Sequence, residues 1–275
     1  MQSLTELSVN EVKARLLDIL VYFKQVCDEN DIQYSLAYGT LLGAVRHGGF
    51  IPWDDDVDVC MLRDDYERLI KILCDSKHDR FKLIYAGNEP TYYYNFAKIV
   101  DCETTVTEIG SKPITGYGVF IDIFPLDNCP SDRKKFNKLI KQIRRVSHFR
   151  SASVCNGSSP VMSSVKNAVR RAVAPFAKMF GFRHWLNKEE KKIRKYNDTN
   201  TGYVACLEEC LSYSEIMRKY EITFDGRIMF ENMRFSCFSN YDKYLQGRYG
   251  NYMELPPESE RVQRHGYKAY LKEVQ

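Results

Sequence analysis

The chain has 275 residues, of which 44% are hydrophobic and 28% are charged, a composition that suits one large domain or a core domain with an insertion. No apolar run approaches the ~20 residues that a membrane-spanning helix requires, which excludes an integral membrane protein. The first residues lack the basic and apolar regions of a secretory signal, and the nine cysteines show no paired spacing. We therefore expect a cytoplasmic location and free thiols.

Residues 1–130 alternate between helix and strand patterns. Ser8 and Glu11 form a capping box, and apolar residues at helical spacing then predict a helix over residues 9–29. A strand leads through Gly39 to Thr40, which we predict to cap a short helix that ends near Arg46. The following segments predict a strand, a helix and then four strands: 55–61, 63–76, 81–87, 94–100, 104–109 and 117–124. This order predicts an α/β (α+β) core with a mixed sheet and flanking helices.

The middle of the chain has a different electrostatic character. Residues 131–200 contain 18 Lys/Arg and 4 Asp/Glu, a net charge of +14. The rest of the chain contains 22 Lys/Arg and 32 Asp/Glu, a net charge of −10. Helical patterns surround a loop, "SASVCNGSSP", so this range predicts a basic helical insertion. Residues 201–275, with a hairpin pattern and a further helix, are predicted to complete the core domain that residues 1–130 begin.

An acidic cluster follows the short helix. In a strand, alternate side chains share a face, so Asp56 and Asp58 lie together at ~7 Å, a separation at which two carboxylates repel each other unless a cation binds. Oxygen ligands of this kind suit Mg²⁺. A solvated acidic turn is the alternative interpretation. Asp122 lies inside an apolar strand, where either an arginine neutralises it or it completes a metal site with three carboxylates.

Four segments together resemble the LicD family of phosphotransferases, which is related to fukutin and belongs to the nucleotidyltransferase superfamily. They are "AYGTLLGAVRHGGFIPWDDDVDV", "FAKIVD", "FIDIFPLD" and "YLQGRYGNYMELPP". The resemblance implies a nucleotidyltransferase-like fold. It also implies transfer of phosphocholine, or of a related phospho-alcohol, from a CDP-linked donor to a sugar hydroxyl of a cell-surface glycan such as lipopolysaccharide, teichoic acid or capsule, with CDP-choline as the expected donor.

This resemblance implies roles for particular residues. Asp56, Asp58 and Asp122 are the catalytic residues and hold Mg²⁺ or Mn²⁺, and Asp122 orients or deprotonates the acceptor hydroxyl. Glycine and a helix start favour a phosphate, and the donor-binding set is Gly39, Thr40, Arg46, His47, Trp53, Asp55 and Lys98. Structural alternatives remain for several of these residues: helix-end cations for Arg46 and His47, core packing for Trp53, a turn role for Asp55 and a solvated face for Lys98.

A basic amphipathic helix is predicted within residues 163–185, with a kink at Pro175. An ordinary helix packed on the core is the alternative. Membrane contact at the inner face of the cytoplasmic membrane, next to a lipid-linked acceptor, is predicted for Arg170, Arg171, Phe176, Lys178 and Phe180.

Two other functions compete with this interpretation. One is a nucleotidyltransferase that acts on RNA or on a small molecule, and the other is a non-catalytic membrane-surface protein. The insertion lacks aromatic residues interleaved with its basic ones over most of its length, so no nucleic-acid partner is expected.

Overall fold

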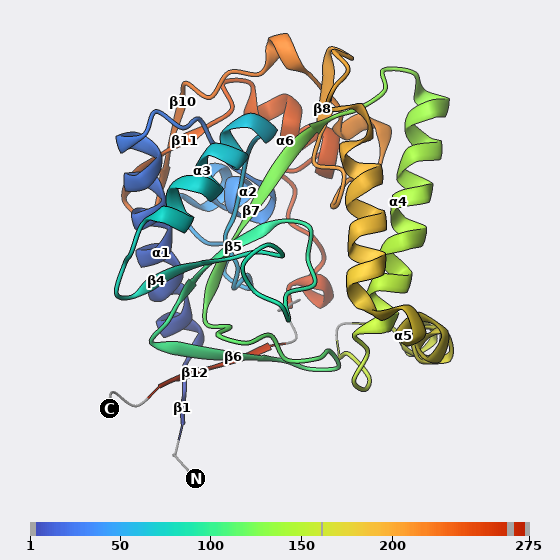
Figure 1. Ribbon diagram of the computed structural model, residues 1–275. Helices are drawn as coiled ribbons and strands as arrows, with labels where there is room; N and C mark the ends of the chain where they lie inside the picture. The colour runs from blue at the N-terminus through green and yellow to red at the C-terminus, as the bar shows by residue number, and fades with distance from the viewer. Residues whose placement is uncertain (1–3, 161, 263–266, 273–275) are drawn as a thin grey trace.

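The computed structural model describes residues 4–160, 162–262 and 267–272, and a mixed sheet lies at its centre (Figure 1). The main path of the sheet follows the order β2 (Ser35–Leu36), β3 (Asp58–Leu62), β7 (Phe120–Asn128), β5 (Ala97–Asp101) and β4 (Phe81–Ile84). Strands β3 and β7 are parallel, whereas the other neighbours on this path are antiparallel. The end of β7 also pairs with β8 (Tyr203–Ala205), which pairs with β9 (Met217–Arg218). The predicted mixed sheet is confirmed.

Three helices of the N-terminal half pack on this sheet. They are α1 (Val9–Glu29), α2 (Tyr38–His47) and α3 (Arg63–Asp75). The capping box of Ser8 and Glu11 is present, and α1 buries an apolar stripe against β5 and β7. Helix α3 packs on β3, β4 and β7. The helices predicted over residues 9–29 and 63–76 are confirmed.

Two smaller β-units complete this part of the molecule. The predicted hairpin consists of β10 (Gly226–Phe230) and β11 (Met233–Cys237), joined by a turn in which Glu231 and Asn232 have φ of 48° and 63°. The predicted helix α6 (Tyr241–Tyr249) follows it. A separate sheet has the order β1 (Thr5–Glu6), β12 (Tyr267–Leu271) and β6 (Thr104–Glu108), which places the two ends of the chain side by side.

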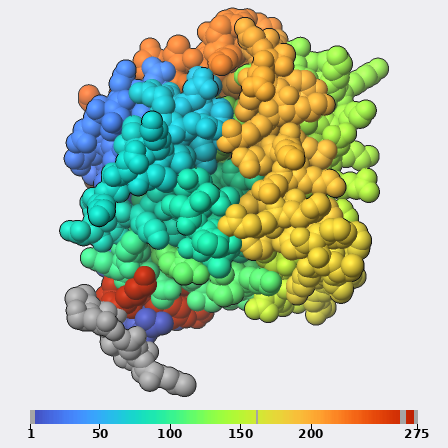
Figure 2. Space-filling view, viewed as in Figure 1, coloured from blue at the N-terminus to red at the C-terminus, as the bar shows by residue number. Residues whose placement is uncertain are grey.

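The basic insertion forms a pair of long helices beside the sheet, α4 (Arg133–Ser153) and α5 (Ser164–Ile193) (Figure 1). Its green and yellow atoms form the right side of the molecule in Figure 2. The backbone of α5 breaks at Gly181 (φ 71°, ψ 157°), so the kink lies six residues beyond the predicted position at Pro175. The Trp185 indole N–H donates to the Ala177 carbonyl at 2.9 Å and joins the two parts of α5 across this break. A second apolar core lies between the insertion and the segment after it: Cys129, Phe136, Leu139, Ile140, Ile143, Ile193, Ala205, Leu207 and Cys210.

A buried arginine connects α4 to three other segments. Arg150 Nε donates to Glu189 of α5 at 2.5 Å, and Nη2 donates to Glu208 at 2.9 Å. Nη1 donates to the carbonyl of Tyr93 at 2.6 Å. Because all of these groups are removed from water, the arginine charge is needed to compensate two buried carboxylates.

We predict that Arg150→Met lowers the free energy of unfolding by about 3–5 kcal/mol, because Glu189 and Glu208 lose their shared counter-ion. Chemical denaturation measures the change. Arg145→Met, at an exposed position of the same helix, is the matched control and should change the free energy by less than about 0.5 kcal/mol. Equal effects of the two substitutions would contradict a structural role for the buried cluster.

Candidate active site

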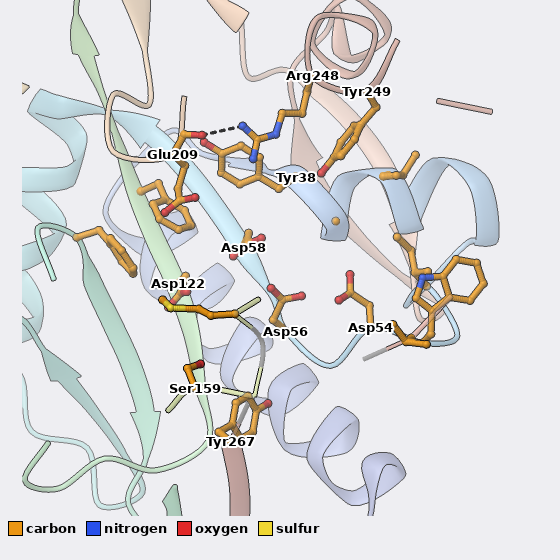
Figure 3. A pocket seen from close by; sticks show the side chains of 18 of the residues that line it. Tyr38, Asp54, Asp56, Asp58, Asp122, Ser159, Glu209, Arg248, Tyr249 and Tyr267 are labelled. Atoms are coloured by element: carbon orange, nitrogen blue, oxygen red, sulfur yellow. Dashed lines mark hydrogen bonds between the residues drawn. The ribbon is translucent and has the colours of Figure 1, made fainter. Parts of the chain in front are cut away.

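A cavity of about 990 Å³ lies where the central sheet, α2, the helical insertion and the C-terminal segment meet. Its lining includes Asp56, Asp58 and Asp122, the three predicted catalytic carboxylates. Figure 3 shows these carboxylates, together with that of Asp54, around one open space. The structure therefore brings the three predicted acids together, although 64 residues separate Asp58 from Asp122 in the chain.

Strand register explains why the acids meet. Asp58 and Asp122 are direct partners in the parallel pair of β3 and β7, and Asp56 lies two residues before Asp58. Their joint charge also acts on nearby phenols. Burial raises the pKa of Tyr249, and the carboxylates of Asp54, Asp56 and Asp58 raise it further. These carboxylates together with that of Asp122, which we call the acidic wall, favour a cationic ligand.

Thr40 holds the backbone segment that carries Asp58. Helix α2 begins at Tyr38 after Ala37, so the prediction that Thr40 caps this helix is wrong. The Thr40 hydroxyl is buried and accepts a hydrogen bond from the backbone N–H of Asp58 at 2.8 Å. The Asp58 carbonyl accepts a hydrogen bond from the Ala37 N–H at 2.9 Å. Both bonds hold the start of β3 against α2, which fixes the position of the Asp58 side chain.

The cation beside Asp122 is a lysine. Lys98 of β5 is the register partner of Asp122, and its ammonium forms an ion pair with the Asp122 carboxylate. Only 3% of Lys98 is exposed, and its ammonium lies 3.6 Å from the centroid of the Phe120 ring. Lys98 lines the cavity, and its ion pair is with Asp122, one of the three predicted catalytic carboxylates.

The donor set of the acidic wall suits a hard divalent ion, because carboxylate oxygens are what Mg²⁺ and Mn²⁺ bind. Within the described part of the chain, however, no three His, Cys, Asp or Glu side chains are arranged as a complete metal site. Mg²⁺ commonly binds to one or two carboxylates and completes its shell with substrate phosphates and water. The residues fit that mode of binding, in which Asp56 and Asp58, both of which line the cavity, would be the carboxylate ligands (Figure 3).

The predicted donor-binding residues fall into two groups. Gly39, Arg46, Trp53 and Lys98 line the cavity. Arg46 also donates to the carbonyls of Tyr252 at 3.1 Å and Glu254 at 3.3 Å, so it joins α2 to the C-terminal segment. A Cβ atom on Gly39 would lie 2.6 Å from Asp54 Oδ2, so glycine here leaves room for that carboxylate.

The side chains of Thr40, His47 and Asp55 are not part of the cavity lining. His47 is exposed at the end of α2, with its ring 6.3 Å from that of Trp53. Asp55 is buried, and its carbonyl accepts a hydrogen bond from the Tyr267 hydroxyl at 2.7 Å.

Sequence reasoning did not assign several residues of the cavity lining to the site. Residues of the insertion and of the C-terminal half contribute Arg150, Arg170, Glu209, Arg248 and Tyr249. Burial raises the pKa of the Glu209 carboxyl. Arg150 and Glu209 lie outside the sequence motifs described above, so only the packing of distant segments brings them to the cavity.

One predicted membrane contact is wrong. Arg170 is buried and donates hydrogen bonds to the carbonyls of Ser151 at 3.1 Å and Gly110 at 2.9 Å. It holds α5 to the core because its guanidinium satisfies backbone groups at the base of the cavity. The other four predicted residues, Arg171, Phe176, Lys178 and Phe180, are exposed.

In the described part of the chain, no helix combines the length and the apolar character needed to span a bilayer.

The sequence of the chain is similar to those of known proteins. The family model described as LicD/FKTN/FKRP, nucleotidyltransferase domain, matches residues 31–136, which contain the whole acidic wall. The chain is 31% identical over 272 residues to the lipopolysaccharide cholinephosphotransferase LicD of Haemophilus influenzae, and the match covers 97% of this chain and 99% of that protein. The chain belongs to the LicD family.

The family match makes this LicD-family chain a transferase. Shorter similarities also occur. An uncharacterized protein of Rickettsia prowazekii is 47% identical over 49 residues, which is 18% of each chain. An uncharacterized protein of Rickettsia typhi is 39% identical over 66 residues, which is 24% of this chain and 21% of that protein.

We predict that Thr40→Val lowers the free energy of unfolding by about 1–3 kcal/mol, because the buried N–H of Asp58 loses its acceptor while the side-chain volume stays similar. Thr40→Ser keeps the hydroxyl and is the control for the hydrogen bond, so it should retain most of the stability. Thermal and urea denaturation of both variants give the comparison. If the two variants lost the same stability, the hydrogen bond to Asp58 would not be the important contact.

Proposed function

We propose that this LicD-family chain transfers phosphocholine from CDP-choline to a sugar hydroxyl of lipopolysaccharide or of a similar cell-surface glycan. The supporting observation is the similarity over nearly the full length of both chains to the Haemophilus influenzae cholinephosphotransferase. The cavity agrees with this proposal because it combines an acidic wall for a metal-bound diphosphate with polar and aromatic walls that have room for a donor and an acceptor sugar.

In the proposed reaction, the acceptor hydroxyl oxygen attacks the phosphorus that carries choline, and the bond from that phosphorus to the bridging oxygen of CMP breaks. Asp56 and Asp58 would hold Mg²⁺ or Mn²⁺, which neutralises charge on the diphosphate and on the departing CMP. Asp122 accepts the proton of the attacking hydroxyl. Lys98 fixes the direction of the Asp122 carboxylate through their ion pair, and Thr40 fixes the backbone that carries Asp58.

The nucleotidyltransferase alternative would require the basic insertion to bind a polyanion. The two insertion arginines in the cavity lining are already bound within the protein: Arg150 by Glu189 and Glu208, and Arg170 by backbone carbonyls. They are not arranged to bind successive phosphates of a nucleic acid. We therefore keep the CDP-alcohol donor as the proposed substrate and propose no nucleic-acid partner.

The decisive experiment measures the release of CMP from CDP-choline, CDP-ethanolamine, CDP-glycerol and CDP-ribitol in the presence of a lipopolysaccharide acceptor. We expect release from CDP-choline that requires Mg²⁺ or Mn²⁺ and stops in EDTA. In parallel, CTP is supplied with RNA, and pyrophosphate is measured. Pyrophosphate release without CMP release would support the nucleotidyltransferase alternative and contradict the proposal.

We predict that Asp58→Asn lowers the rate of CMP release by more than about 100-fold, because even partners of metal ligands contribute 10–100-fold in such sites. The stabilisation of the wild type by Mg²⁺ in a melting experiment should also disappear. Glu190→Gln is the matched control, because it removes one carboxylate charge from the exposed face of α5. An Asp58→Asn variant that retained near-normal turnover would exclude Asp58 as a metal ligand.

We also propose that the first part of α5 binds the inner face of the cytoplasmic membrane, next to a lipid-linked acceptor. Its outward side carries five exposed apolar residues, opposite the buried Asn167, Arg170, Ala174 and Ala177. These five residues are Val165, Val169, Phe176, Met179 and Phe180. Lys166, Arg171 and Lys178 flank the apolar side, which is the arrangement of a helix that lies in an anionic membrane surface.

We predict reversible binding to vesicles that contain phosphatidylglycerol, and weaker binding as the salt concentration rises. Arg171→Glu with Lys178→Glu should release the protein, since each basic residue near such a surface contributes about 1 kcal/mol. Lys134→Glu with Lys138→Glu, at exposed positions of α4, makes the same change of charge elsewhere and should leave binding largely intact. An equal loss of vesicle binding with both pairs of substitutions would show that only the net charge of the protein matters, and it would contradict binding through α5.

A further inference from the structure

The proposed phosphocholine donor carries a quaternary ammonium group, and the inference below rests on that proposed function. The acidic wall explains binding of a metal and a diphosphate. It does not explain how the enzyme would select choline from other alcohols. A second region of the same cavity combines aromatic rings with one carboxylate, which is the chemistry that recognises a quaternary ammonium.

Aromatic rings form a continuous wall beside the catalytic acids. Phe124 of β7 lies in its middle, with its ring centroid 4.4 Å from that of Phe96 and 5.5 Å from that of Tyr38. The ring of Tyr94 continues the wall, 5.3 Å from Phe96. All four residues line the cavity. Phe124 lies two residues after Asp122 in the same strand, so the wall begins next to the position proposed for the reacting phosphate.

Glu209 supplies the carboxylate of this region. Its side chain points into the cavity, on the side where Asp58 and Asp122 lie (Figure 3). Arg248 donates to the backbone carbonyl of Glu209 at 2.7 Å, and the same guanidinium forms an ion pair with Glu215. This contact positions the main chain of Glu209 without binding its carboxylate. Burial raises the pKa of the Glu209 carboxyl, so a cation placed beside it would favour the charged form.

The basic side chains around this region have other partners. Lys98 is paired with Asp122, and Arg150 is paired with Glu189 and Glu208. Arg248 lies over the Tyr38 ring at 4.8 Å and is paired with Glu215. Within the described residues, no ion pair holds the Glu209 carboxylate. A ligand with a positive charge would therefore meet an acid that no protein cation neutralises by direct contact.

We propose that Glu209 and the rings of Tyr38, Phe96 and Phe124 form the subsite for the trimethylammonium head of the transferred phosphocholine. The faces of these rings are polarisable and apolar, so they suit methyl groups that spread a positive charge. A primary ammonium would lose its hydrogen bonds to water against the same rings. The subsite therefore selects choline over ethanolamine, and Glu209 supplies attraction without contacting the bond that breaks.

The test compares wild type and Glu209→Gln with two donors: CDP-choline and the CDP ester of 3,3-dimethylbutanol, in which an uncharged carbon replaces the ammonium nitrogen. For CDP-choline we expect KM to rise about tenfold in the variant and kcat to change little. For the uncharged donor we expect no change in either constant. A loss of kcat of the same size with both donors would show that Glu209 acts as a proton acceptor and would overturn the proposal.

Direct binding separates this inference from the proposed function. Calorimetry with phosphocholine should show binding to wild type and at least tenfold weaker binding to Glu209→Gln, whether or not CMP is released. Phe124→Leu keeps an apolar side chain and removes one ring, and it should also weaken phosphocholine binding while melting near the wild-type temperature. Glu190→Gln serves as the control for charge. Equal phosphocholine affinity in wild type and Glu209→Gln would overturn the subsite.

Discussion

Repulsion between carboxylates on two adjacent parallel strands is the constraint on which the site depends. Neighbouring strands lie about 4.8 Å apart, and Asp58 and Asp122 occupy directly opposed positions on β3 and β7. Such a pair costs stability unless positive charge lies nearby. Lys98 supplies part of that charge from β5, and a hydrogen bond from Thr40 holds the Asp58 backbone in place. Both carboxylates line the same cavity.

The basic insertion changes what the acidic wall can do. A nucleotidyltransferase-like sheet alone would expose its acids on an open surface, whereas α4, α5 and the loop between them build a side of the cavity about 990 Å³ in volume. Arg150 and Arg170 are important for this arrangement because their side chains bond to segments of the core. Much of the insertion charge at the cavity is thus neutralised or hydrogen-bonded, and the charge left on the outward face of α5 is what supports the membrane proposal.

The residues of the cavity divide by chemistry. The acids lie at the start of β3 and in β7, and the aromatic wall continues from them toward Glu209. A phosphocholine donor has the same division, because a polar diphosphate is joined to a methylated cation by only two carbons. The distribution of charge and aromatic surface in the cavity therefore matches the donor proposed for this LicD-family chain better than a polyanionic substrate.

The sequence by itself determined the features that depend on local patterns. These include the capped helix α1, the apolar strand around Asp122 and the hairpin of β10 and β11. It also identified the family, because the acidic motif is contiguous. The limits of α2 were predicted less well, since Thr40 resembles a cap residue but its hydroxyl bonds to Asp58 from within the helix.

Only the tertiary structure decided which distant groups meet. It paired Asp122 with Lys98, buried Arg170 against backbone carbonyls, placed the break of α5 at Gly181 and brought Glu209 to the aromatic wall. Helical spacing shows that a basic residue lies off the apolar stripe, but it does not show whether water or another segment covers that side. The physical reason is that burial and ion pairing depend on segments far apart in the chain, whereas periodicity reports only on neighbours within a few residues.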